Sequence, residues 1–151
     1  MISTKVARVA LCAAALGLAL SSGLAANVAS AAASPKLVVT PATNLHNGES
    51  VKVSGTGFKP GDSVYIVECL VTAKGQSNCN ILNTVSATIS KRGALPKSTF
   101  KVSTGKIGSG KGSGACGTKT SNLKDCGVSV GNISGGDSAV FRIAFKAPAK
   151  K

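Results

Sequence analysis

The feature of this chain that most constrains its fold is a succession of short runs rich in β-branched residues, separated by clusters of Gly, Pro, Asn and Asp. After residue 33, apolar residues never recur at helical spacing over a useful length. Short strands divided by turn residues are typical of β-sandwiches and β-barrels, so we predict an all-β domain. Seven runs fit this description: residues 36–40, 50–54, 63–71, 84–90, 95–103, 127–130 and 139–146.

Several of these runs alternate between apolar and polar residues, as strands with one buried face do. Val51 and Val53 fall on one side of their run, and Lys52 falls on the other. Two connecting stretches, residues 72–83 and 104–125, are too long for tight turns. Binding residues are often carried by long loops on a rigid scaffold, so we expect function in these two stretches.

The first 33 residues have the pattern of a secretory signal peptide. Lys5 and Arg8 give a positive start, and the apolar run 9–20 is followed by two Ala-x-Ala patterns. We predict a signal peptide over residues 1–31, with cleavage between residues 31 and 34 and a secreted product. The apolar run is shorter than the roughly 20 residues that span a bilayer. We therefore expect no transmembrane segment after signal removal, with anchorage by this run as the alternative.

The chain that remains is long enough for one domain, over residues 32–145, followed by a short basic tail, 146–151. The whole sequence has 18 Lys and Arg against 5 Asp and Glu. Removing the signal leaves 16 basic residues against the same five acids, a net charge of +11. We expect a monomeric, strongly cationic domain.

A positive charge of this size attracts DNA and other polyanions. The aromatic content is 3% and Trp is absent, so no stacking platform for reading bases is expected and binding would be non-specific. The alternative is that the charge only keeps the protein in solution. The candidate polyanion contacts lie in the long glycine-rich stretch: Lys106, Lys111, Lys119 and Lys124.

After signal removal the chain has an even set of four cysteines, Cys69, Cys79, Cys116 and Cys126. In an exported protein such a set indicates disulfides, and four cysteines allow three pairings. The local pairing, Cys69 with Cys79 and Cys116 with Cys126, is the simplest because each bond closes one long stretch. A zinc site is disfavoured because there is no C-x-x-C motif and only one histidine.

The sequence provides no set of catalytic residues. Residues 105–112 approach the phosphate-loop pattern but lack its final hydroxyl and a following helix, so we expect a flexible cationic loop. His46 lies among turn residues and is expected to be exposed, without a nucleophile beside it. Glu68 is the one acid within a strand, and we expect it at an edge or in solvent, with a cleft position as the alternative. We predict no enzyme activity, no metal and no resident cofactor.

A set of short motifs follows in order along the chain: the run Val38-Val39-Thr40-Pro41, Gly48, the run Val51-Lys52-Val53-Ser54-Gly55, the turn Pro60-Gly61, the four cysteines and the closing strand 140–145. Together these motifs resemble the neocarzinostatin family of enediyne-antibiotic apoproteins, which actinomycetes export. The resemblance covers residues 37–145 and implies a seven-stranded, immunoglobulin-like antiparallel β-sandwich with a two-stranded ribbon.

The resemblance also implies a binding site. Family members hold a labile enediyne chromophore in a cleft, with the first disulfide at its floor, and release it onto DNA. Here the floor would be Cys69 and Cys79, and the positions of two stacking rings would be Val71 and Thr84. The rings are therefore missing, and each stacked pair contributes on the order of 1 kcal/mol beyond area burial.

We therefore expect a secreted antibiotic or antimicrobial apoprotein that binds a hydrophobic, enediyne-type small molecule and is associated with DNA binding. The alternative function on the same fold is a ligand-free cationic module that binds the cell envelope or another polyanion.

Overall fold

The computed structural model describes residues 34–72 and 78–148, which belong to one compact unit. The predicted signal peptide and its cleavage site lie outside the described residues. So do residues 73–77 of the first long stretch and residues 149–151 of the basic tail.

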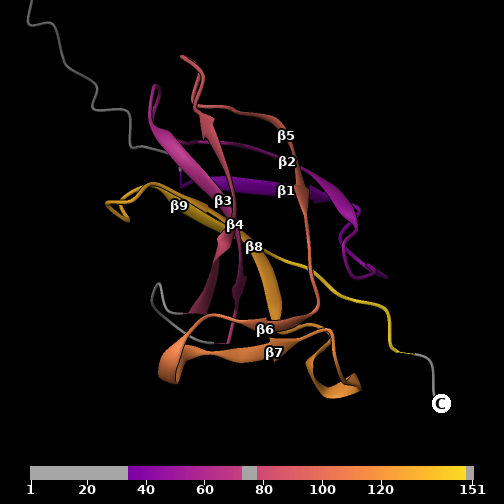
Figure 1. The fold of residues 1–151 in the computed structure, drawn as a ribbon. Helices are drawn as coiled ribbons and strands as arrows, with labels where there is room; N and C mark the ends of the chain where they lie inside the picture. The colour runs from indigo at the N-terminus through magenta and orange to yellow at the C-terminus, as the bar shows by residue number, and fades with distance from the viewer. Residues whose placement is uncertain (1–33, 73–77, 149–151) are drawn as a thin grey trace, which may run out of the picture. The chain divides into compact units, whose positions relative to one another are not determined.

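The described residues form two antiparallel sheets and a separate ribbon (Figure 1). One sheet has the order β1-β2-β5 and the other has the order β4-β3-β8-β9, while β6 pairs with β7. The seven-stranded immunoglobulin-like sandwich with its ribbon is thereby confirmed. The strands are β1 (Lys36–Thr40), β2 (Ser50–Thr56), β3 (Ser63–Leu70), β4 (Cys79–Thr88), β5 (Leu95–Lys101), β6 (Gly105–Ile107), β7 (Gly114–Cys116), β8 (Cys126–Gly131) and β9 (Ser138–Arg142).

The core lies between the inner faces of the two sheets and follows the alternation of the sequence. In β2, Val51 and Val53 are fully buried and Lys52 is exposed. In β3, Val64 and Ile66 are fully buried while Tyr65 between them faces outward. Burial of an aliphatic side chain of this size contributes about 1.5–3 kcal/mol, so these inward positions hold the sheets together.

The long stretch 104–125 is more ordered than its six glycines suggest. It contains the ribbon strands β6 and β7 and two single-turn 3-10 helices, η2 (Gly110–Gly112) and η3 (Thr120–Asn122). Ile107 is buried in the main core, and contacts between β3 and both ribbon strands place the ribbon next to β3 (Figure 1). The expectation of a flexible loop therefore fails for the ribbon strands, because Ile107 packs on the domain.

Both disulfides are local, as the simplest pairing predicts. Cys69 is bonded to Cys79, and Cys116 is bonded to Cys126. The first bond joins residues that are also cross-strand partners in the β3–β4 ladder. Strand β4 consequently begins at Cys79 rather than at Thr84. No helix among the described residues is long and apolar enough to cross a membrane.

Candidate functional site

The outer face of the four-stranded sheet carries the candidate site. The pleat that turns Val64 and Ile66 inward turns Tyr65 and Val67 outward on β3. The strand registers then place one residue of each strand in a continuous outward row. Across β4, β3, β8 and β9, this row is Thr84, Val67, Ser129 and Val140.

A groove of about 540 Å³ lies over this face. The turn between β8 and β9 contributes Ile133 and Gly135 to it, and the start of β4 contributes Cys79 and Ile81. Tyr65 is the one aromatic residue that lines the groove. Its full lining is Tyr65, Val67, Cys79, Ile81, Thr84, Ser129, Gly131, Asn132, Ile133, Gly135 and Ser138. The groove thus has a largely apolar lining on a rigid sheet floor.

A smaller hollow of about 350 Å³ lies next to the groove, on the side of the ribbon. It shares Cys79 and Ile81 with the groove and adds Leu82 from β4. The ribbon side is formed by Lys106, Gly108 and Ser109. Among the residues that the structure describes, Lys106 is the one charged residue that lines either hollow.

The polar groups at the opposite end of the groove are bound to one another. The Lys59 ammonium lies 3.8 Å from the Asp62 carboxylate. Asp62 Oδ2 also accepts a hydrogen bond from the Asn132 side chain at 3.0 Å. The backbone N–H of Lys59 donates to Asp137 Oδ2 at 2.8 Å. These contacts fasten the β8–β9 turn, and with it Ile133, to the turn before β3.

Of the four residues predicted for the ligand cleft, three lie at or next to the groove and one does not. Cys79 and Thr84 line it, and Cys69 lies behind Cys79 through their disulfide. Val71 instead lies against Gly127, where an added Cβ would come within 2.6 Å of Val71 Cγ1. Only glycine fits between Val71 and the sheet at this position.

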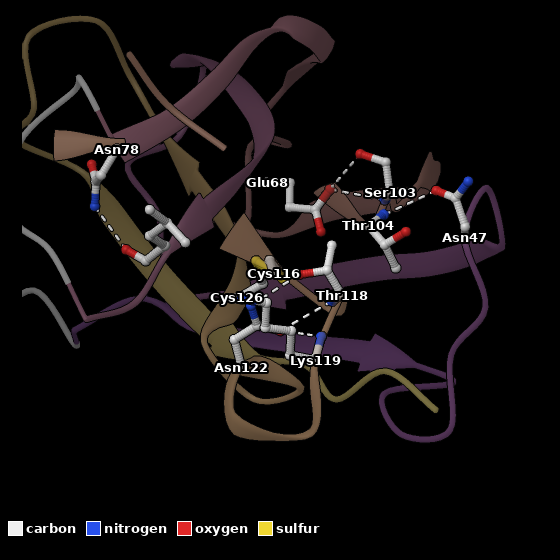
Figure 2. The surroundings of a disulfide bond; sticks show 11 residues. Asn47, Glu68, Asn78, Ser103, Thr104, Cys116, Thr118, Lys119, Asn122 and Cys126 are labelled. Atoms are coloured by element: carbon white, nitrogen blue, oxygen red, sulfur yellow. Dashed lines mark hydrogen bonds between the residues drawn. A yellow bond between two sulfur atoms is a disulfide. The ribbon is translucent and has the colours of Figure 1, made fainter. Parts of the chain in front are cut away.

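The four predicted polyanion contacts are all exposed. Lys106 lies on β6 and faces the smaller hollow, while Lys111 belongs to η2. Lys119 precedes η3, and its backbone N–H donates to the Asn122 side chain at 2.9 Å, as Figure 2 shows. Lys124 lies between η3 and the second disulfide. Their contact with polyanions stays a prediction.

The expectation that Glu68 lies at an edge or in solvent is wrong. This residue is fully buried, because it shares the inward phase of Val64 and Ile66. Its Oε2 accepts hydrogen bonds from the backbone N–H and the hydroxyl of Ser103, at 2.9 and 3.0 Å (Figure 2). Its Oε1 has no hydrogen-bond partner among the described residues. Burial raises the pKa of Glu68 from 4.5 to about 7, against the opposing effect of the two Ser103 bonds.

Glu68 also lies beside the second disulfide. One carboxylate oxygen and the sulfurs of Cys116 and Cys126 all lie within 4.8 Å of one another. The two sulfurs are bonded to each other, so they are not thiolate ligands for a metal ion. This cluster is therefore part of the core and not a metal centre.

His46 is exposed in a turn, as predicted, and its backbone N–H donates to Glu49 Oε2 at 2.7 Å. The residues that the sequence analysis missed are the outward side chains of the sheet. Tyr65 and Val67 could have been found from the alternation of the strand, because they fall on the side opposite to Val64. Ser129 and Ile133 required the register of β8 and the course of the turn after it.

The family model of the neocarzinostatin family matches residues 37–145. The chain is 30% identical over 116 residues to macromomycin of Streptomyces macromomyceticus, covering 74% of this chain and 76% of that protein. It is 36% identical over 121 residues to the antitumor antibiotic C-1027 apoprotein of Streptomyces globisporus, covering 76% and 84%. The solved structure of macromomycin superposes with a TM-score of 0.59 at 29% identity, over 74% of this chain and 99% of that one. The chain belongs to the neocarzinostatin family.

Proposed function

We propose that this protein is a secreted antibiotic apoprotein that holds a hydrophobic, enediyne-type small molecule in the groove over the four-stranded sheet. The observation that carries the proposal is the groove itself. Its volume of about 540 Å³ falls within the range of roughly 300–1,000 Å³ that is typical of small-molecule sites. Its lining is mainly apolar, with a few hydroxyl and amide groups to orient a ligand.

Two further facts support a carrier function. The chain belongs to a family in which one relative is named as the apoprotein of an antitumor antibiotic, that is, as the protein part of a larger complex. The groove floor is also rigid, because it is an antiparallel sheet in which the Cys69–Cys79 disulfide cross-links β3 to β4. A rigid, preformed site loses little ordering entropy when a ligand binds. The role proposed is sequestration, without chemistry by the protein.

The test is the binding of a nonpolar fluorescent dye to the mature protein. In a Val67→Arg variant, a charged side chain would fill the middle of the groove, and dye binding should fall at least tenfold. Val38→Arg is the matched control, because Val38 is an outward, 54% exposed valine on β1 of the other sheet. Equal binding by both variants, or no binding by the parent protein, would contradict the proposal.

The natural cargo requires a second measurement. Native mass spectrometry of protein secreted by its own host should show a non-covalent mass that is lost in organic solvent. The denatured mass reports the signal cleavage site at the same time. A bare native mass in repeated preparations would count against a carrier.

A second function, binding of DNA or another polyanion, is favoured by the outer face of the three-stranded sheet. The exposed outward positions of β1, β2 and β5 include four lysines and no carboxylate. Such a face attracts polyphosphates by charge alone, and its affinity falls steeply with salt. The four lysines are Lys36, Lys52, Lys97 and Lys101.

The two cationic surfaces can be separated by experiment. A triple Glu variant at Lys52, Lys97 and Lys101 should weaken retention on a DNA column and reduce its salt dependence. A triple Glu variant at Lys111, Lys119 and Lys124, three exposed lysines of the segment 104–125, changes the net charge by the same amount. Equal losses in both variants would show that bulk charge, and not the sheet face, determines binding.

A further inference from the structure

We propose that the groove selects an aliphatic carboxylate, with its hydrocarbon chain over the sheet and its anionic group at Lys106 on the ribbon. This inference rests on the proposed carrier function, but it replaces the enediyne-type cargo with an aliphatic carboxylate as the ligand class for the groove. It departs from a polycyclic aromatic cargo, because the described lining offers mainly aliphatic surface and one cation, Lys106.

The surface around the groove is aliphatic and unusually exposed. Ile81 and Leu82 at the start of β4 are 70% and 95% exposed, and Ile133 in the β8–β9 turn is 75% exposed. All three line the groove or the hollow next to it. Large apolar side chains gathered at one concave site indicate a ligand or partner. Tyr65 is the one ring available for stacking in this lining, so an aromatic ligand gains little there beyond burial of its area.

The groove and the hollow are neighbours. They share Cys79 and Ile81, so a ligand that lies over Val67 can continue past Ile81 to the ribbon. An extended chain fits such a path better than a compact ring system.

The charges at the two ends of this path differ. At the far end, Lys59 is paired with Asp62, and Asp62 also accepts from Asn132, so that end is close to neutral. At the ribbon end, Lys106 is exposed, and the described residues that line the hollow and the groove include no acid. A lysine acts as a point charge for a carboxylate, and this asymmetry sets the direction of the ligand.

The experiment compares ligands that differ only in their head group. Dodecanoate, 1-dodecanol and dodecylamine, each below its aggregation concentration, compete with the nonpolar dye. Dodecanoate should bind best and dodecylamine worst. Lys106→Gln should weaken dodecanoate binding about three- to fivefold, the usual size for one partly exposed ion pair, and leave 1-dodecanol unchanged. Lys124→Gln, which removes an exposed lysine of the same segment outside the hollow, should change neither.

The outcomes separate this inference from the proposed function. If all three probes bind equally and Lys106→Gln has no effect, the anion selection is overturned and the carrier function stands. If a polycyclic aromatic probe displaces the dye and none of the dodecyl probes does, the aliphatic selection is overturned. If dodecanoate binds a Val67→Glu variant, in which the groove is filled by an anionic side chain, as well as the parent, it binds elsewhere by charge, which also overturns the inference. If no probe and no dye binds the parent, the proposed function itself fails.

Discussion

Ser103 donates two hydrogen bonds, from its backbone N–H and its hydroxyl, to one carboxylate oxygen of Glu68, and the other oxygen is buried without a partner among the described residues. Because ionisation of such a group in the core is unfavourable, the pKa of Glu68 is raised from 4.5 to about 7. The folded protein therefore holds this proton at pH values where the unfolded chain has lost it.

The stability of the protein should consequently fall as the pH rises from about 4.5 to about 7 and then level off. Below pH 4.5 both states hold the proton, and above pH 7 both have lost it. The shift corresponds to about 3 kcal/mol in the free energy of unfolding. Urea denaturation across this pH range measures it. Glu68→Gln removes the titrating group and should flatten the profile, so a slope that survives in this variant would contradict the assignment.

Gly127→Ala should destabilise the protein by about 1–3 kcal/mol, because the new methyl group has no room. Its Cβ would come within 2.6 Å of Val71 Cγ1 and 2.8 Å of the backbone oxygen of Phe141. Gly136→Ala is the matched control, since no heavy atom lies within 4 Å of its added Cβ. Thermal unfolding of the two variants makes the comparison, and equal melting temperatures would show that Val71 moves aside freely.

The two disulfides should differ in their rate of reduction. Cys116 and Cys126 are fully buried, whereas Cys79 is partly exposed at the groove. A thiol reagent reaches Cys79 in the folded state but needs the core to open before it reaches the second bond. Brief reduction, alkylation and peptide mass spectrometry should find the label first on Cys69 and Cys79. Simultaneous labelling of all four cysteines would mean that reduction proceeds only through global unfolding.

Tyr65 should serve as an intrinsic reporter of the groove. It is the single Tyr of the sequence, which has no Trp, and it lines the site. Any ligand that fills the groove should change the tyrosine fluorescence. Tyr65→Phe should abolish this signal and keep the affinity within about twofold, as expected for an aromatic ring of similar size. An unchanged emission at saturating ligand would place the ligand elsewhere.

The sandwich could be predicted from the sequence because most strands alternate between apolar and polar residues. The ribbon could not be predicted from pattern, since β6 and β7 have three residues each and are surrounded by glycines. Glu68 shows where two rules conflict. Its place in the alternation of β3 predicts a buried side chain, and its charge predicts an exposed one. The structure follows the alternation.

The groove was predictable only in part. Family resemblance led to Cys79 and Thr84, which line the groove. The contributions of Ser129 and Ile133 depend on which strands pair and in what register, and local sequence carries little of that information.

The acidic residues of this chain are mostly used inside the structure. Glu49, Asp62 and Asp137 accept hydrogen bonds that tie turns together, and Glu68 lies in the core. Few carboxylates are therefore left to offset the lysines of the surface. The surface charge of the protein can change by substitution of exposed lysines in the segment 104–125, while substitution of one of these acids removes a contact that holds the scaffold together. Surface charge and fold thus depend on different residues, so the surface charge can change in evolution while the fold is kept.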